Sequence, residues 1–187
     1  MSEQNNDAAT DVELITRAKA GEFEAFGELY RRYIALIYRY LRSRVSLKEE
    51  AEDLAEEVFL KAFQGLERYE ERGVPYGAYL YRIARHTLVD YYRKRDSQPS
   101  AATIDTVEDD QSDPALHVDQ REQFRIIAHY LGMLPQSDQE VIRLRLLLEL
   151  SSEETGQWLG KRAGTVRVQL FRAIKKLRAL MADDEQR

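Results

Sequence analysis

Tyrosine side chains are interspersed with cations in one segment, residues 76–95. Its five tyrosines are Tyr76, Tyr79, Tyr81, Tyr91 and Tyr92, and its five cations are Arg82, Arg85, Arg93, Lys94 and Arg95, with His86 between them. Aromatic rings stack on unpaired bases while neighbouring cations hold phosphates, so this mixture suits single-stranded better than duplex nucleic acid. The other interpretation is that most of the rings belong to a core and only their hydroxyl groups reach the surface.

A second cationic segment lies near the end of the chain. Residues 161–182 contain seven basic side chains and no acid, a density that suits a phosphate backbone. A short expected helix, a turn over 160–164 and a longer helix have the spacing of a helix-turn-helix, whose second helix enters the major groove of DNA. On a helical wheel Val168, Phe171, Arg172 and Lys175 lie opposite the apolar stripe. The alternative is a basic bundle helix whose charges only face water.

Acidic side chains form a ridge on one expected helix. Glu49, Asp53 and Glu57 recur every four residues, with Glu56 beside them. Like charges at this spacing repel and slightly destabilise an isolated helix. The ridge therefore suits a basic partner protein, unless it is simply a solvated face.

The sequence lacks the motifs of the common enzyme and metal sites. No histidine stands three residues after a glutamate, so the Glu-x-x-His motif of di-iron helical bundles does not occur. There is also no glycine-rich phosphate loop and no nucleophile elbow. We therefore expect no catalytic activity, no metal and no cofactor.

All of these segments are expected to lie on helices. Apolar residues recur every 3.6 residues over 22–44, 51–66 and 80–91, and the first two stripes include Phe23 and Phe63 as core residues. No segment alternates with a period of two over a useful length. The sequence therefore predicts an all-α fold.

Local signals predict where helices begin. Capping-box patterns, a Ser or Thr followed three residues later by Glu, start at Thr10, Ser46, Ser137 and Ser151. In the second half of the chain we expect helices over 118–134, 137–148, 152–159 and 165–181, the first two separated by Pro135.

Composition divides the chain into two small helical domains. Its 187 residues are 43% hydrophobic and 33% charged, with a formal net charge of −5. Residues 97–118 have no basic side chain and are rich in Ser, Thr, Asp and Glu, which is typical of a flexible acidic linker. We therefore predict domains over 1–96 and 119–187.

The chain has the features of a cytoplasmic protein. It has no cysteine, so disulfides and thiolate metal sites are excluded. Its acidic, polar start does not resemble a signal peptide, and the most apolar run, residues 141–150, is interrupted by charges. We expect no membrane insertion.

In this order the segments resemble those of the extracytoplasmic-function (ECF) sigma factors of bacterial RNA polymerase. The resemblance is carried by FEAFGELYRRY from Phe23, AEDLAEEVFLKAF from Ala51, YLYRIAR from Tyr79, Leu134-Pro135 with the helix after it, and GTVR from Gly164. It implies that residues 1–96 are sigma region 2 and residues 119–187 region 4. By the same resemblance, residues 97–118 thread toward the polymerase active-site cleft.

The resemblance also implies three contact surfaces. The clamp helices of the largest subunit of core RNA polymerase would contact Asp53, Leu54, Glu56, Glu57 and Val58. The non-template strand of the minus-ten promoter element would contact Tyr76, Tyr79, Arg82, Arg85, His86, Arg93 and Lys94. The duplex minus-thirty-five element would contact Thr165, Arg167, Gln169, Arg172, Lys175 and Lys176. The flap of the second-largest subunit and an anti-sigma factor are further implied partners.

Several positions depart from the family pattern. Glu56 stands where the family usually has Gln, Tyr79 where it has Trp, His86 where it has Asn, and Gln169 where a cation is common. In the helix-turn-helix, Gly156 either permits a close helix crossing or weakens its helix by roughly 1 kcal/mol relative to Ala.

Other interpretations stay open from the sequence. The outward-facing Val168 and Phe171 either touch thymine methyl groups or are covered by a partner protein. The chain as a whole could be a regulator that uses its helix-turn-helix to recruit polymerase without melting DNA. It could also be a protein-interaction bundle that does not contact nucleic acid.

Overall fold

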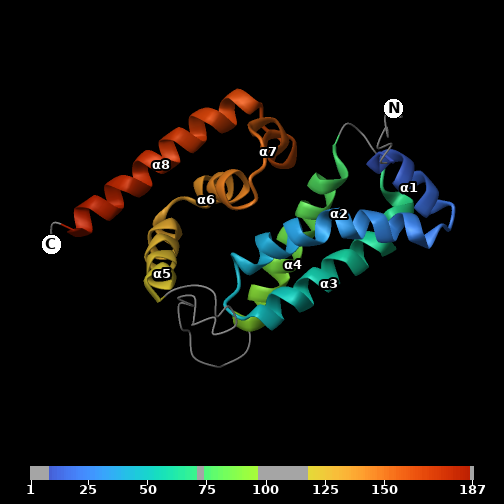
Figure 1. Ribbon diagram of the computed structural model, residues 1–187, viewed down its shortest axis with the longest axis horizontal. Helices are drawn as coiled ribbons and strands as arrows, with labels where there is room; N and C mark the ends of the chain where they lie inside the picture. The colour runs from blue at the N-terminus through green and yellow to red at the C-terminus, as the bar shows by residue number, and fades with distance from the viewer. Residues whose placement is uncertain (1–8, 71–73, 97–117, 186–187) are drawn as a thin grey trace, which may run out of the picture.

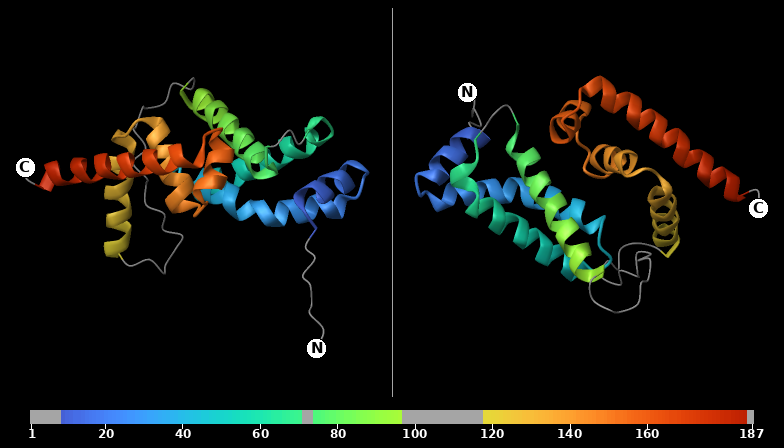
Figure 2. Two further views of the ribbon diagram at one scale, coloured as in Figure 1. Left: turned by 90° about the horizontal axis from the view of Figure 1, so that it is seen from above. Right: turned by 180° about the vertical axis from the view of Figure 1, so that it is seen from behind.

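The computed structural model describes residues 9–70, 74–96 and 118–185, and every regular element within these ranges is a helix. The helices form two groups that lie against each other, α1 to α4 and α5 to α8 (Figure 1). Figure 2 shows both groups from above and from behind. The predicted all-α fold is confirmed. Of the predicted linker, 97–118, only Val118 lies among the described residues, and it begins α5.

The first group is a bundle in which α2, α3 and α4 pack against one another and α1 lies on α2. Its elements are α1 (Asp11–Lys19), α2 (Phe23–Arg42), α3 (Lys48–Gln64), the 3₁₀ turn η1 (Leu66–Arg68) and α4 (Tyr76–Asp96). The predicted apolar stripes supply much of its interior, including the buried residues Ile37, Leu41, Val58, Ala62 and Leu80, and Leu29, which is outside the predicted stripe, is buried with them. Burial of such stripes, rather than helix propensity, provides most of the stability of helices in a protein.

The second group consists of shorter helices against one long helix. Its elements are α5 (Val118–Met133), α6 (Gln136–Ile142), the π-helical turn η2 (Arg143–Leu147), α7 (Ser152–Leu159) and α8 (Ala163–Glu185). The long helix α8 packs on α5, α6 and α7. A tight turn joins α7 to α8, as the helix-turn-helix pattern predicts.

Two of the four predicted capping boxes are confirmed. Thr10 caps α1 and Ser151 caps α7, each with the reciprocal bond from its glutamate. The other two predictions are wrong, because Leu47 precedes α3 and Pro135 precedes α6 without a side-chain cap. Ser137 lies inside the first turn of α6, so its side chain cannot act from outside the helix.

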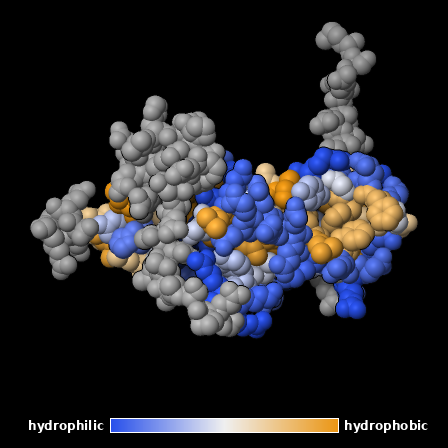
Figure 3. Space-filling model, turned by 90° about the horizontal axis from the view of Figure 1, so that it is seen from below, coloured by the Kyte–Doolittle hydropathy of each residue, from blue (hydrophilic) through white to orange (hydrophobic). Residues whose placement is uncertain are grey.

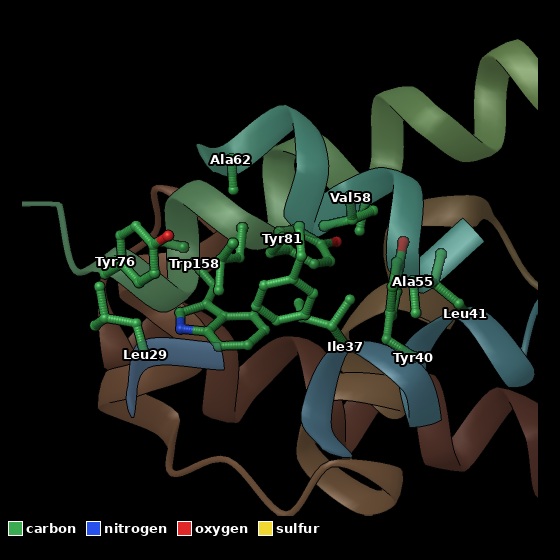
Figure 4. Packing of buried hydrophobic residues seen from close by; sticks show 14 of the residues in the cluster. Leu29, Ile37, Tyr40, Leu41, Ala55, Val58, Ala62, Tyr76, Tyr81 and Trp158 are labelled. Carbon is green, nitrogen blue, oxygen red and sulfur yellow. The ribbon is translucent and has the colours of Figure 1, made fainter. Parts of the chain in front are cut away.

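Part of the second group joins the hydrophobic core of the first, while Leu134, Ile142 and Ala173 form a separate, smaller cluster. Turn η2 contacts α2, and α7 contacts α4. The buried side chains of Leu144, Leu148, Leu150 and Trp158 belong to the same cluster as the interior of α1 to α4. Figure 4 shows Trp158 among the side chains of the first group, next to Tyr81. The contact therefore joins segments on opposite sides of the predicted linker.

Gly156 is required by the turn of the helix-turn-helix. A Cβ at this position would lie 2.5 Å from the carbonyl oxygen of Lys161, which is a backbone atom and cannot rotate away. The turn is closed by a 2.8 Å hydrogen bond from the Lys161 N–H to the Gly156 carbonyl, and Gly160 has a left-handed φ of 67°. Of the two interpretations of Gly156, the close approach is correct.

We expect Gly156→Ala to lower the free energy of unfolding by about 1–3 kcal/mol, because the added methyl group must displace backbone. Gly132→Ala in α5 is the matched control, since a Cβ there meets nothing within 4 Å. That substitution should be neutral or stabilise by roughly 0.5–1 kcal/mol. Urea unfolding of both variants measures the difference, and equal effects of the two substitutions would contradict the steric explanation.

Candidate nucleic-acid and protein interfaces

The outer face of α4 is cationic and open to solvent. Arg82, Arg85 and His86 are exposed, and the Arg85 guanidinium lies 6.0 Å from the centre of the Tyr81 ring. Near the end of the helix Arg93 and Lys94 are also exposed, and Arg93 forms a 2.9 Å ion pair with Asp90. An exposed pair of this kind contributes at most about 1 kcal/mol, so phosphate can replace the carboxylate at little cost. This face can bind an anionic strand.

The tyrosines of α4 face mainly inward. Tyr76 and Tyr81 are each 1% exposed, while Tyr79 is only half-buried. Tyr76 packs in a ring cluster with Tyr33, Tyr69 and Tyr79 at centroid distances of 5.5–5.8 Å, and burial raises the pKa of its hydroxyl. The core interpretation therefore holds for Tyr76, and we remove it from the expected minus-ten contacts.

Tyr91 and Tyr92, near the end of α4, are half-buried. Burial raises the pKa of the Tyr91 hydroxyl to about 12, and a hydrogen bond to Glu50 adds to this rise. The Tyr92 hydroxyl donates to the backbone carbonyl of Arg44. Of the two tyrosines predicted to contact the minus-ten strand, Tyr76 is buried and Tyr79 is accessible in part.

The acidic ridge on α3 is exposed along its outer side. Asp53 and Glu56 are exposed, and Glu57 is half-buried with a 2.7 Å ion pair to Lys61. Leu54 and Val58 are only 6% and 0% exposed, because they face α2 and α4. We therefore remove those two residues from the expected polymerase contact, which leaves the carboxylates.

An exposed apolar patch lies beside the ridge, and two of its three residues, Phe23 and Phe63, belong to the predicted core stripes. Phe23, Leu60 and Phe63 are 74%, 57% and 41% exposed. The Phe63 ring lies 6.2 Å from that of Phe23 and 4.9 Å from that of Phe26. Figure 3 shows apolar side chains gathered at the end of the molecule formed by α1, α2 and the end of α3. The apolar stripe is wider than the surface that the neighbouring helices cover, so its edge remains exposed to solvent. Exposed apolar patches of this kind are typical of partner-binding surfaces.

The recognition helix α8 presents most of its predicted DNA-facing residues to solvent. Thr165, Arg167, Arg172 and Lys175 are exposed, and Arg167 forms an ion pair with Glu153 at 3.1 Å. On the same helix Val168 and Phe171 are 50% and 71% exposed, as the helical wheel predicts. The exposed side of α8 therefore combines cations with two apolar side chains.

Two predicted DNA contacts on α8 are instead tied to α6. The Gln169 amide donates to the Asp138 carboxylate at 3.0 Å and accepts a hydrogen bond from Lys161. Lys176 forms a 2.8 Å ion pair with the same carboxylate. Asp138 is 7% exposed, so these contacts hold α8 against α6. No local sequence pattern indicates this role, because Asp138 stands over 30 residues before its partners Gln169 and Lys176 in the chain.

Two family models match this chain. The first, Sigma-70 region 2, covers residues 29–98, and the second, Sigma-70, region 4, covers residues 124–177. Among curated proteins, the ECF RNA polymerase sigma factor ShbA of Streptomyces griseus is 33% identical over 177 residues, covering 89% of this chain and 93% of ShbA. The ECF sigma factor BldN of Streptomyces coelicolor is 33% identical over 183 residues, covering 96% of this chain and 69% of BldN. The chain belongs to the ECF sigma factors.

Solved structures agree with this family. The structure of CnrH in complex with the cytosolic domain of CnrY matches this sigma factor with a TM-score of 0.66 and 25% identity, over 91% of this chain and 96% of that chain. The sigma factor RpoE of Bartonella quintana, solved with the anti-sigma factor NepR, has the same fold with a TM-score of 0.59 and 23% identity, covering 84% of this chain and 96% of that chain. Sigma factors are non-catalytic subunits that bind RNA polymerase and direct it to promoter DNA. No helix within the described residues is both long and apolar enough to cross a bilayer.

The cluster formed by Asp138, Gln169 and Lys176 makes the stability of this sigma factor sensitive to acid. Although burial raises the pKa of the carboxyl, hydrogen bonds from Lys176 and Gln169 lower it more, so the pKa lies below its usual range. A pKa lower in the folded than in the unfolded state stabilises the fold above the unfolded value of about 3.9. That contribution disappears as the pH falls through the lowered folded pKa.

We expect Asp138→Asn to destabilise the sigma factor at pH 7 by about 1–3 kcal/mol, because Lys176 loses its charged partner. As the pH falls below the unfolded value of about 3.9 and through the lowered folded pKa, the difference from wild type should shrink, since the folded wild-type carboxyl then becomes neutral as well. Urea unfolding at several pH values measures both effects. A difference between the two proteins that stays constant down to pH 2 would show that the charge of Asp138 is not the cause.

Proposed function

We propose that this sigma factor holds core polymerase through α3, the minus-ten non-template strand through α4 and the minus-thirty-five duplex through α8. The observation that carries the proposal is that one chain exposes three charged surfaces, one acidic and two cationic. The face of α3 is acidic with an apolar edge, while those of α4 and α8 are cationic.

The polymerase contact has two parts in this proposal. Asp53 and Glu56 attract a basic surface of the clamp helices, and the exposed rings of Phe23 and Phe63 supply apolar area next to them. Complementary charges mainly set the rate and register of association, whereas buried aromatic side chains supply most of the affinity. The flap of the second-largest subunit would contact region 4.

Promoter opening needs no external energy source in this proposal. Arg82, Arg85 and His86 would hold the separated non-template strand along the outer face of α4, and the half-buried Tyr79 would contact a base. Each stacked or held base offsets roughly 1–3 kcal/mol of the cost of unpairing. Arg167, Arg172 and Lys175 would contact the upstream duplex, where bidentate contacts from arginine to guanine are the commonest specific ones.

An anti-sigma factor is the regulator that we propose. The exposed apolar patch supports this, because a surface of this kind in a free sigma factor requires a protein partner. Polymerase and anti-sigma factor would then compete for the same face of α3. The site of action would be the cytoplasm, where the polymerase is.

Reconstitution tests the proposal. The purified chain would be added to bacterial core RNA polymerase with a library of promoter fragments at fixed salt, and run-off transcripts would be sequenced. We expect transcripts from a small set of promoters that share two elements, and none with core polymerase alone. A folded chain that binds core but yields no start site, or binds duplex without supporting transcription, would favour the recruiting regulator instead.

A further inference from the structure

The carboxylate of Asp138, in the first turn of α6, binds two side chains of the recognition helix. One of its oxygens accepts a 3.0 Å hydrogen bond from the Gln169 amide, and the other forms a 2.8 Å ion pair with Lys176. The carboxylate is buried where α6 lies against α8 (Figure 1). Both of its oxygens are therefore engaged by residues that the sequence predicts to contact DNA.

The amide of Gln169 has protein partners at both ends. Its oxygen accepts a 2.7 Å hydrogen bond from Lys161, and its nitrogen donates to Asp138 and, at 3.0 Å, to the backbone carbonyl of Ser137. A glutamine that reads adenine offers the same oxygen and nitrogen to the N6 and N7 atoms of the base. While its protein bonds persist, Gln169 cannot make that bidentate contact.

The neighbouring lysines of α8 have different surroundings. Gln169 and Lys176 are seven residues apart, which is nearly two helical turns, so both leave the helix on the side that faces α6. Lys175 is turned from Lys176 by about 100° and is exposed. The Lys176 side chain is itself 54% exposed, so the ion pair, rather than burial, directs its ammonium group toward α6.

The Lys176 ion pair resists exchange with DNA phosphate because its carboxylate is buried. If Lys176 moved to a phosphate, Asp138 would be left as a buried charge without its cation, which is strongly unfavourable. The ion pair between Arg167 and Glu153 differs, since these side chains are 62% and 66% exposed and water can replace either partner. Arg167 can therefore leave its carboxylate for DNA, whereas Lys176 stays with Asp138.

We propose that Asp138 is a positioning residue that determines which side chains of α8 contact the minus-thirty-five element. By holding Gln169 and Lys176 at the edge of the recognition helix, it leaves the contact to the exposed cations of the same helix. The inference rests on the proposed function, because only a helix that binds duplex DNA has contacts to select. Readout of the duplex then depends on a residue that does not itself touch DNA.

The two adjacent lysines test this withdrawal from DNA. The measurement is the affinity of the reconstituted holoenzyme for a duplex that carries only the upstream element, at several salt concentrations. A lysine that contacts a phosphate contributes about 0.9 to the slope of log affinity against log salt. We expect Lys175→Ala to reduce the magnitude of the slope by about this amount, and Lys176→Ala to leave it unchanged. Equal reductions in the two variants would overturn the proposal.

Asp138→Asn tests whether the carboxylate is the cause. The new amide keeps an oxygen that can accept from Gln169 and removes the charge that holds Lys176. The magnitude of the slope should rise by about 0.9, and this gain should disappear when Lys176→Ala is added. Both variants lack the same negative charge, so the difference between them reports Lys176 alone. If Lys176→Ala has the same effect with and without Asp138→Asn, the carboxylate does not direct this lysine.

Circular dichroism checks that each variant keeps its helices. The comparison of Lys175→Ala with Lys176→Ala does not involve Asp138→Asn, so it decides the proposal even if that variant fails to fold.

Selection of upstream sequences tests Gln169. From duplexes with a randomised upstream element, holoenzymes with the wild-type chain and with Gln169→Ala should select the same bases. Arg172→Ala, at an exposed position of the same helix, should lose at least about fivefold of the preference at one base pair. A base preference that changes as much in Gln169→Ala as in Arg172→Ala would show that Gln169 reads DNA and would overturn the proposal.

The same binding data separate failure of this inference from failure of the proposed function. If neither lysine variant nor Arg172→Ala changes the affinity for the upstream duplex, α8 does not bind that element and both are wrong. If Lys175→Ala weakens binding and Lys176→Ala weakens it equally, the proposed function stands and the role of Asp138 is wrong.

Discussion

Replacing Arg82 and Arg85 together by alanine is expected to reduce promoter opening by at least about 100-fold while leaving upstream duplex binding unchanged. Both guanidinium groups are exposed on α4 and would hold the phosphates of the separated strand. A hydrogen bond to a charged group contributes about 1.5–3 kcal/mol, and about 1.4 kcal/mol corresponds to a factor of ten. Two lost contacts therefore give about two orders of magnitude or more.

The measurement is the rate of open-complex formation by the reconstituted holoenzyme, together with its affinity for a duplex that carries only the upstream element. The matched control is Arg17→Ala with Arg31→Ala, which removes two exposed arginines of the same helix group that form surface ion pairs. The control should open promoters normally. Equal losses in the two double variants would mean that net charge, rather than the face of α4, determines opening.

Reversing the charges of Asp53 and Glu56 to lysine is expected to lower the affinity for core polymerase at least about 100-fold. Both carboxylates are exposed on α3, so the substitutions remove no buried contact and should not unfold the chain. Like charges facing each other across an interface cost several kcal/mol. Binding to labelled core polymerase, measured at two salt concentrations, should also lose part of its salt dependence.

Glu67→Lys provides the control for the charge reversal, because Glu67 is exposed in η1 of the same helix group but stands outside the ridge. Its affinity for core should remain within a factor of about three of wild type. If Asp53→Lys with Glu56→Lys binds core as tightly as this control, the ridge is a solvated face and the polymerase must bind elsewhere.

Much of the helical framework could be predicted from the sequence, because the signals are local. Apolar spacing placed α2, α3 and α4, and the reciprocal Ser151 and Glu154 bonds fixed the start of α7. The exposure of Arg172 and Phe171 on α8 likewise followed from helical geometry alone. These features depend on residues three or four positions apart, which the sequence shows directly.

Contacts between distant segments could not be predicted in this way. Glu140 pairs with Tyr81 and Tyr40, 59 and 100 residues away, although its spacing from Ser137 resembles a capping box. Trp158 looks like an ordinary core residue of a small helix and instead completes the core of the other group. The buried Tyr76 shows the same limit, since composition cannot distinguish a stacking ring from a packed one.

The exposed rings beside the ridge were missed for a different reason. Periodicity assigned Phe23 and Phe63 to the apolar stripe, yet no described helix covers that edge of it. A stripe wider than one helix contact is a signal that could have been used. Comparing the number of apolar positions per turn with the area that one neighbouring helix covers would have predicted that these rings are exposed.

The most direct test of the central claim is permanganate footprinting of unpaired thymines on a promoter selected by run-off transcription. Core polymerase with the wild-type chain should give reactive thymines at the minus-ten element, and core alone should give none. With Arg82→Ala and Arg85→Ala in the chain, the reactivity should vanish while protection of the minus-thirty-five duplex persists. Transcription from that promoter without any reactive thymine that depends on this chain would contradict the account of a sigma factor that opens DNA through α4.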